Sequence, residues 1–99
     1  AINQGAVEGI PEDASVEIAC VVDGTGPHPI HFGEIPLPIR GLIQAVKAYE
    51  SLTVQAAVEG SRRVAMQALM AHPLVPSWEV ARPLLDELLT ANRQWLRWA

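Results

Sequence analysis

Residues 37–59 read Leu-Pro-Ile-Arg-Gly-Leu-Ile-Gln-Ala-Val-Lys-Ala-Tyr-Glu-Ser-Leu-Thr-Val-Gln-Ala-Ala-Val-Glu, and this stretch decides the fold. Its one glycine, Gly41, is near the start, and Pro38 falls in the first helical turn, where proline is tolerated. A thin polar stripe runs along it: Arg40, Gln44, Lys47, Ser51, Gln55 and Glu59. Most other positions are apolar: Ile39, Leu42, Ile43, Val46, Tyr49, Leu52, Val54, Ala56, Ala57 and Val58. The stretch predicts a long helix of the kind that lies inside a larger body.

The composition of the whole chain points the same way. Charged residues make up 18% of the 99 residues, against roughly 25% in ordinary soluble domains, and apolar residues make up 49%. A chain this short is expected to form one domain and to need more surface charge, not less. The sequence also opens on Ala1 without an initiator Met. We therefore expect a piece of a larger protein; the alternative is a compact, slightly hydrophobic monomer.

Charge and cysteine usage exclude several classes of protein. The net charge of -4 and the lack of a Lys/Arg cluster argue against binding to nucleic acid. No apolar run approaches the ~20 residues that span a bilayer, and no signal peptide is present, so no membrane association is predicted. The single Cys20 excludes an internal disulfide and suits a reducing compartment. These features predict a cytoplasmic location.

A short β-hairpin is predicted upstream of the long helix. Residues 1–15 are expected to be irregular, and residues 16–22 are rich in β-branched types, which favours a strand. The sequence Asp-Gly-Thr-Gly-Pro over residues 23–27 is typical of a turn. Residues 28–32 would form a return strand, which Pro29 confines to an edge.

Two shorter helices are predicted downstream. Gly60 should end the long helix, and a second helix should run from the cap Ser61 to about Ala71. A third helix should start at the cap Ser77 and reach toward Trp98. Pro83 predicts a kink or a restart in that third helix. The expected inner faces are Val64, Ala65, Ala68 and Leu69, then Ala81, Leu84, Leu85, Leu88, Leu89, Trp95 and Leu96. The predicted fold is therefore α+β and helix-dominated: a short hairpin followed by one long and two shorter helices.

Sequence patterns of known catalytic sites are absent. Gly24-Thr-Gly26 precedes a proline and not a helix, so it does not form a dinucleotide-binding turn. Asp86 and Glu87 are adjacent on a helix and diverge by about 100°, so they do not converge on one substrate atom. They fit a solvated face, where Arg82 and Asp86 are spaced for a weak ion pair.

One group of residues has the ligand types of a metal site. Cys20, Asp23, His28 and His31 would suit zinc or another transition ion. However, the spacing Cys-x7-His-x2-His matches no closed site, and residues three apart in an extended segment point to opposite faces. We expect no metal here: the cysteine is predicted to be a small buried hydrophobe and both histidines exposed or hydrogen-bonded.

The tryptophans and the third histidine have structural explanations. Trp95 falls on the apolar stripe of the third helix and is expected in a core or interface, and Trp98 is expected to dock near the end of the chain. His72 precedes Pro73 at a helix end, where a positive charge favours the helix dipole.

Three stretches, in order and at similar spacing, resemble the carboxyl end of the family-4 glycoside hydrolases. The first is Asn3-x-Gly5-x-x-x-x-Ile10-Pro11-x-Asp13-x-x-Val16-Glu17-Ile18. The second is Val22-Asp23 followed by Gly26, Pro29, Gly33 and Ile35-Pro36. The third is Ala68-Leu69 through Pro73-Leu74-Val75 and then Leu84-Leu85-Asp86-Glu87-Leu88-Leu89. The resemblance spans essentially the whole chain.

The resemblance implies an unusual glycosidase chemistry. Family members of the α-galactosidase and 6-phospho-glucosidase types use NAD and a divalent ion, commonly manganese, and are an exception to the two-carboxylate mechanism. They oxidise the sugar at C3, which acidifies the C2 proton and permits elimination followed by addition of water. The family places its dinucleotide fold at the amino end and its metal ligands in the middle. Its fold is related to that of the lactate and malate dehydrogenases, including their C-terminal domain.

On this resemblance, residues 1–99 are one region, the C-terminal part of a substrate and oligomerisation domain. No catalytic, cofactor-binding or metal-binding residue is carried over: Cys20 and Tyr49 both lack the family's surrounding motifs. Asn3, on the entering loop, is the one candidate for contact with substrate, and the favoured alternative is that it serves as a turn residue. The expected partners are the upstream dinucleotide-binding part, a sugar or sugar phosphate, and further copies in a homo-oligomer, with the chain inert alone. The alternative is a stand-alone, non-enzymatic helical module that dimerises.

Overall fold

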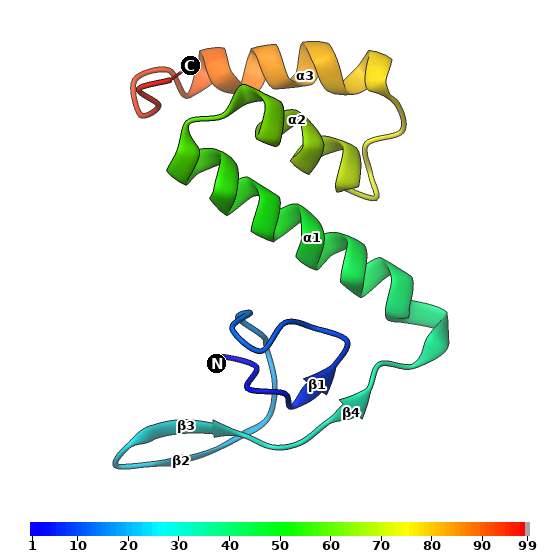
Figure 1. The fold of residues 1–99 in the computed structure, drawn as a ribbon, viewed down its shortest axis with the longest axis vertical. Helices are drawn as coiled ribbons and strands as arrows, with labels where there is room; N and C mark the ends of the chain where they lie inside the picture. The colour runs from blue at the N-terminus through cyan, green and yellow to red at the C-terminus, as the bar shows by residue number, and fades with distance from the viewer. Residues whose placement is uncertain (99) are drawn as a thin grey trace. The chain divides into compact units, whose positions relative to one another are not determined.

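The computed structural model describes residues 1–98, which form two compact units; the first is Ala1–Gln44 and the second starts at Ala45. Each unit has its own small core, and the fold is α+β and helix-dominated, as predicted (Figure 1). None of the three helices in this described part of the chain is long and apolar enough to cross a bilayer. The elements are β1 (Val7–Glu8), β2 (Cys20–Asp23), β3 (Gly26–Pro29), β4 (Gly33–Glu34), α1 (Leu37–Glu59), α2 (Arg62–Ala71) and α3 (Trp78–Ala91).

The predicted hairpin is present, but its strands are displaced. β2 and β3 pair in an antiparallel fashion. The strand predicted over residues 16–22 is β2 in the structure and begins only at Cys20. The residues before Cys20 have no complete partner strand. The return strand predicted over residues 28–32 is displaced to β3, because the turn consists of only Gly24 and Thr25.

A second pair of strands was not predicted. β1 and β4 are parallel, with Val7 opposite Gly33 and Glu8 opposite Glu34. The carbonyl of Ala6 accepts hydrogen bonds from the amides of Phe32 (2.8 Å) and Gly33 (3.0 Å). The prediction that residues 1–15 are irregular is wrong at β1, since a two-residue strand is too short for alternation to reveal it.

The helices of the second unit begin where the sequence predicts, and α2 also ends where predicted. The Ser61 and Ser77 hydroxyls cap α2 and α3 by accepting hydrogen bonds from the amides of Val64 (3.2 Å) and Val80 (3.3 Å). α2 and α3 pack side by side (Figure 1). Their buried residues come from the predicted faces: Val64, Ala68, Ala81, Leu85 and Leu89.

The third helix differs from its prediction in two respects. α3 does not restart at Pro83, which lies inside the helix, and the alternative of a kink stays a prediction. A proline there removes only one donor from the ladder, and the packing of the face around Leu85 keeps the remaining turns helical. α3 ends at Ala91, so Trp95 lies beyond it and is 75% exposed, outside the core of this chain.

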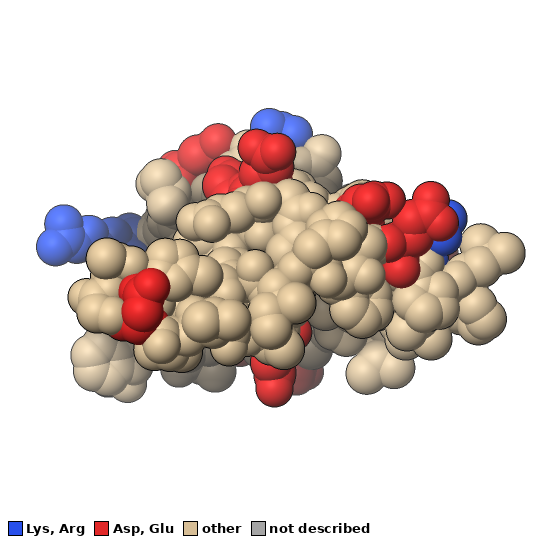
Figure 2. Space-filling view, turned by 90° about the horizontal axis from the view of Figure 1, so that it is seen from below, with Lys and Arg blue, Asp and Glu red and all other residues tan. Residues whose placement is uncertain are grey.

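The apolar residues of α1 remain largely uncovered within residues 1–98. Leu37 is 76% exposed, Leu42 56%, Val54 63% and Val58 82%, and Ala56 alone is buried on this helix. The surface in Figure 2 is mostly uncharged, with acidic side chains in several separate places. This is the exposed apolar surface that the undercharged sequence predicts.

Gly41 inside α1 and Gly60 just after it give a matched pair of substitutions. Gly60 has φ +64°, and a Cβ there would lie 3.1 Å from the Trp98 side chain, whereas a Cβ at Gly41 would meet nothing within 4 Å. We expect Gly60→Ala to lower the free energy of unfolding by about 1–2 kcal/mol, the cost of a left-handed residue with a side chain. Gly41→Ala should raise it by about 0.5–1 kcal/mol. Thermal unfolding followed by the helical circular dichroism signal would check both signs; a loss at both positions would contradict this account of Gly60.

Candidate functional site

Asn3 organises the loop that precedes β1. Its side chain is fully buried, with 0% exposure. The Nδ2 group donates to the carbonyls of Val7 (3.1 Å), Ile10 (2.9 Å) and Pro11 (3.2 Å), and Oδ1 accepts from the amide of Val7 (2.7 Å). Every hydrogen-bonding atom of the amide therefore serves the loop, which explains why an asparagine is needed here. The prediction that Asn3 also contacts substrate stays a prediction.

A small hollow lies beside this loop in the first unit. Its volume is about 160 Å³, and Gln4 (φ +50°) and Gly5 (φ +81°) turn the backbone around it in the left-handed region. His31 faces Glu8 at 3.9 Å, too far for a hydrogen bond. The residues lining the hollow are Asn3, Gln4, Gly5, Ala6, Pro29 and His31. Because the loop uses the whole Asn3 amide, the polar side chains left in the lining are Gln4 and His31, which suit binding of a small polar group better than acid–base chemistry.

The tip of the β2–β3 hairpin carries a hydrogen-bonded network. Asp23 Oδ1 accepts from the Thr25 amide (2.8 Å) and the Thr25 hydroxyl (2.7 Å), and it lies 3.0 Å from His28 Nε2. The Thr25 oxygen is also 2.8 Å from that ring nitrogen. All of these groups are exposed, so the network fixes the turn, as an aspartate does at the start of many turns.

The same network sets the ionisation of Asp23. The Thr25 hydroxyl, then the Thr25 amide and then His28 stabilise the carboxylate and lower the pKa of Asp23 below its ordinary value. Because the folded pKa is lowered, the stabilisation is present above the unfolded pKa and is lost as the pH falls through the folded pKa. Thr25→Ala should raise the pKa of Asp23 towards its ordinary value. An NMR titration of the Asp23 carboxyl carbon measures this, and an unchanged midpoint would contradict the assignment.

The four residues with metal-ligand chemistry do not converge. Asp23 and His28 meet at the hairpin tip, whereas Cys20 lies opposite Pro29 at the base, half-exposed, with its thiol near the Ile18 carbonyl (3.4 Å). Within residues 1–98 no group of three or more His, Cys, Asp or Glu side chains is placed to hold a metal ion. The expectation of a buried Cys20 is only partly met, because β2 belongs to a two-stranded sheet that leaves Cys20 half-exposed.

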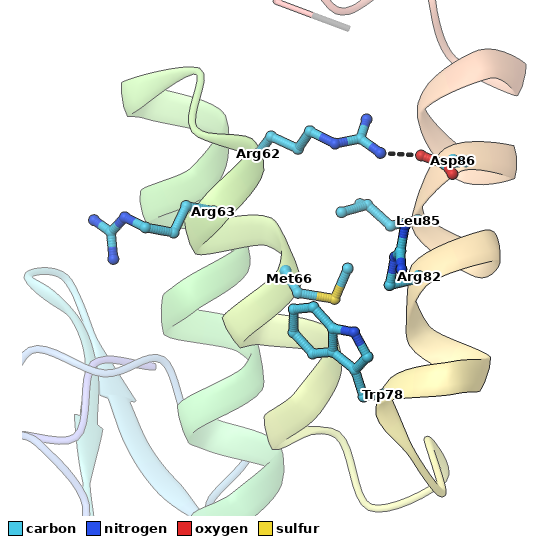
Figure 3. A pocket seen from close by; sticks show the side chains of 7 residues that line it. All are labelled: Arg62, Arg63, Met66, Trp78, Arg82, Leu85 and Asp86. Atoms are coloured by element: carbon cyan, nitrogen blue, oxygen red, sulfur yellow. Dashed lines mark hydrogen bonds and ion pairs between the residues drawn. The ribbon is translucent and has the colours of Figure 1, made fainter.

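A larger groove runs between α2 and α3 (Figure 3). Its volume is about 340 Å³, and Met66 and Trp78 lie together on its floor. Arg62 reaches across from α2 and pairs with Asp86 of α3. The remaining lining residues are Arg63, Arg82 and Leu85.

The cations of this groove do not form an anion site. Arg62 is neutralised by Asp86, and Arg63 points away from α3 in Figure 3, where it hydrogen-bonds Gln67 at 3.4 Å. Among residues 1–98, Arg63 and Arg82 of this groove make no ion pair with an acidic side chain. The predicted Arg82–Asp86 pair is wrong, because Asp86 pairs with Arg62 instead; such a contact between helices leaves no signal in i, i+4 spacing.

An apolar hollow of about 200 Å³ lies elsewhere in the second unit. Trp98, one of its lining residues, rests against Gly60, in agreement with its predicted docking role. Nearby, the His72 ring meets the Tyr49 ring edge-on, with centroids 4.5 Å apart, and His72 Nδ1 accepts from the Leu74 amide. His72 therefore closes the end of α2 through its backbone amide and its ring. The predicted interaction of a positive charge on His72 with the helix dipole stays a prediction.

Known proteins place the whole chain in one family. Residues 1–75 match the family 4 glycosyl hydrolase C-terminal domain. The chain is 45% identical over 95 residues to a probable 6-phospho-beta-glucosidase of Bacillus subtilis, covering 96% of the chain and 22% of that protein. It is 39% identical over 95 residues to a 6-phospho-beta-glucosidase of Thermotoga maritima, covering 96% of the chain and 23% of that protein.

Solved structures of phospho-glucosidases are also similar to this chain. A 6-phospho-alpha-glucosidase from gut microorganisms, in complex with NAD and glucose-6-phosphate, superimposes with a TM-score of 0.91 at 38% identity over 97% of this chain and 22% of that one. The Thermotoga maritima 6-phospho-beta-glucosidase with manganese, NAD+ and glucose-6-phosphate gives a TM-score of 0.85 at 38% identity, over 97% of this chain and 24% of that one. The chain thus spans less than a quarter of the length of these relatives. It belongs to the family 4 glycosyl hydrolases and matches their C-terminal domain.

Proposed function

We propose that this chain is the C-terminal part of a 6-phospho-glucosidase that uses NAD and manganese. The observation that carries the proposal is the match of residues 1–75 to the family domain, together with 45% identity to a phosphoglucosidase along 96% of the chain. Relatives in this family are solved with NAD, manganese and glucose-6-phosphate. The whole enzyme would hydrolyse sugar-phosphate glycosides in the cytoplasm, a compartment that suits the free thiol of Cys20.

The residues of this chain do not fit either cofactor. Within residues 1–98 no side-chain cluster is placed to hold a metal ion, and no glycine-rich turn joins a strand to a helix. We expect NAD and manganese to be held by polypeptide that precedes this region in the proposed enzyme, and the 99 residues alone to be inert. When bound, they supply the redox step at the sugar; this chain supplies structure.

The proposed contributions of the chain are a wall of the substrate pocket and contacts between subunits of a homo-oligomer. The apolar residues Leu42, Val54 and Val58 of α1, each more than half exposed, would pack against the rest of the enzyme or against a second copy. Asn3 would belong to the substrate pocket as the residue that shapes its loop. The hollow beside that loop and its polar lining support this placement.

An assay of two forms of the protein tests the proposal. The natural polypeptide that includes all residues upstream of Ala1 and the 99-residue chain would each be given p-nitrophenyl 6-phospho-α- and β-glucosides, NAD and manganese. We expect turnover by the longer form that is lost on chelation of the metal, and none by the 99 residues. Turnover by the 99 residues alone, or a gene with no strand, glycine-rich turn and helix upstream, would overturn it. Size-exclusion chromatography of the longer form tests the oligomer.

A further inference from the structure

The tip of the β2–β3 hairpin joins an aspartate directly to a glycine in an exposed turn. Asp23 and Gly26 form the last pair of the hairpin, so the turn consists of Gly24 and Thr25 alone. Asp23, Gly24 and Thr25 are all exposed, and the hairpin extends away from the rest of the first unit (Figure 1). Among the aspartates of this sequence, Asp23 alone precedes a glycine. This dipeptide therefore differs in chemistry from every other acidic position of the chain.

An aspartate followed by a glycine can react with its own backbone. The amide nitrogen of Gly24 attacks Cγ of Asp23, so that an N–Cγ bond forms, the bond from Cγ to the acid hydroxyl breaks, and the hydroxyl leaves as water with the amide proton. The product is a five-membered succinimide ring. Water then opens the ring at either carbonyl carbon, which gives back aspartate or gives isoaspartate, whose main chain runs through Cβ and Cγ. Water is the only co-reactant, and no group is oxidised or reduced.

Gly24 leaves the attacking nitrogen accessible. A glycine has no side chain to shield its own nitrogen or to restrict its backbone. A Cβ at Gly24 would meet nothing within 4 Å in the described chain, and the φ angle of Gly24 lies outside the left-handed region. An alanine therefore fits at this position without strain, so the absence of a side chain affects the reactivity of the turn and not its conformation.

The hydrogen bonds of the turn oppose this reaction. Asp23 Oδ1 accepts from the Thr25 hydroxyl (2.7 Å) and the Thr25 amide (2.8 Å) and lies 3.0 Å from His28 Nε2. These contacts restrict rotation of the carboxyl group. They also lower the pKa of Asp23, and the ionised carboxylate has no hydroxyl to lose as water. Both effects make attack by the Gly24 nitrogen slower than in a free Asp-Gly turn.

We propose that Asp23-Gly24 is a site of spontaneous isoaspartate formation and that the hydrogen bonds from Thr25 and His28 slow the reaction. Isoaspartate lengthens the main chain by one carbon atom at the last pair of the hairpin. A two-residue turn sets the register of both strands, so the longer chain disrupts the pairing of β2 with β3 at the tip. The inference is independent of the proposed function.

Ageing of the natural polypeptide that contains these residues tests the proposal. The unchanged protein and the variants Gly24→Ala, Thr25→Ala and Thr25→Ser are incubated at neutral pH and sampled over weeks. Isoaspartate is quantified by methyl transfer from S-adenosylmethionine with an isoaspartyl methyltransferase, and electron-transfer fragmentation of peptides locates it in the sequence. Asp13, which is also exposed but precedes Ala14, is the control within the same chain.

We expect isoaspartate at residue 23 to form several-fold faster in Thr25→Ala than in the unchanged protein, because the hydroxyl is lost. Thr25→Ser keeps the hydroxyl and should restore the original rate, and Gly24→Ala should be slower by an order of magnitude. Asp13 should stay unmodified. Absence of isoaspartate at residue 23 from both the unchanged protein and Thr25→Ala, or an equal amount at Asp13, overturns the assigned site. Equal rates in the unchanged protein and Thr25→Ala overturn the role of the hydrogen bonds.

Discussion

Replacing Asn3 with alanine is expected to unfold the first unit locally. The substitution leaves the carbonyls of Val7, Ile10 and Pro11 and the amide of Val7 without their partner in a fully buried place. Each unsatisfied buried group costs about 1–3 kcal/mol, and partial rehydration brings the sum to about 3 kcal/mol. Amide exchange in residues 1–35 should then be about 100-fold faster, since 1.4 kcal/mol is tenfold.

The matched control is Asn92→Ala. Asn92 is exposed, and its Nδ2 makes one hydrogen bond, to the Leu88 carbonyl, at the end of α3. Its loss should cost about 0.5–1 kcal/mol and leave exchange of the Ala14 and Gly33 amides unchanged. NMR exchange rates report both variants residue by residue. Equal effects of the two substitutions would show that burial of Asn3 contributes nothing special.

Asn3→Asp adds a pH dependence with a defined sign. A carboxylate at this position would direct its second oxygen at three carbonyl oxygens, so the folded state disfavours ionisation and raises the pKa above its unfolded value. Stability relative to the unfolded chain is then greatest below the unfolded pKa and falls as the pH rises through the folded pKa. The exchange defect should therefore shrink on acidification, and a defect that grows at low pH would contradict this arrangement.

Truncation of Leu85 is the second large effect. Leu85 is 3% exposed and comes from the face of α3 that packs against α2. Leu→Ala at a buried site removes apolar contacts and leaves a cavity, at a cost of 2–5 kcal/mol, here about 3 kcal/mol. With a denaturant dependence of about 1–3 kcal/mol per molar urea, the unfolding midpoint should fall by roughly 1–3 M.

Leu88→Ala on the same helix is the control. Leu88 is 43% exposed, so the same atoms are removed from a site that water already reaches. Because both substitutions change helix propensity equally, the difference between them isolates burial. We expect the midpoint shift to be less than half that of Leu85→Ala, measured by tryptophan fluorescence. Equal shifts would mean that α2 and α3 do not pack as described.

The helical half of the fold could be predicted because its signals are local. Gly60 marks the end of α1 and adopts the left-handed conformation, and Ser61 and Ser77 cap the next two helices as expected. Pro83 shows the limit of such reasoning: the local rule predicts a kink or a restart, and the helix does not restart, because packing of the α3 face keeps the following turns helical. Arg62 likewise reaches Asp86 across 24 positions in the sequence, which no local spacing predicts.

The non-helical half and the candidate site depend on distant pairing. Residues 16–22 have strand character, but a strand forms only where a neighbouring strand completes its hydrogen bonds. β2 therefore begins at Cys20 and not at residue 16. The sequence indicates Asn3 as a turn residue, but its hydrogen-bond partners could not be predicted, because they lie four to eight residues away in an irregular loop. That Asn3 belongs to a stretch similar to the family 4 glycoside hydrolases could be recognised only from the resemblance.

The aromatic residues are divided unequally between the two units. Trp78, Trp95, Trp98 and Tyr49 all belong to the second, and the first contains only Phe32. Tryptophan fluorescence therefore does not report unfolding of the loop and hairpin of the first unit, which contains no tryptophan. A comparison of emission with the NMR signals of residues 1–35 during one titration directly measures whether the halves lose structure together or one after the other.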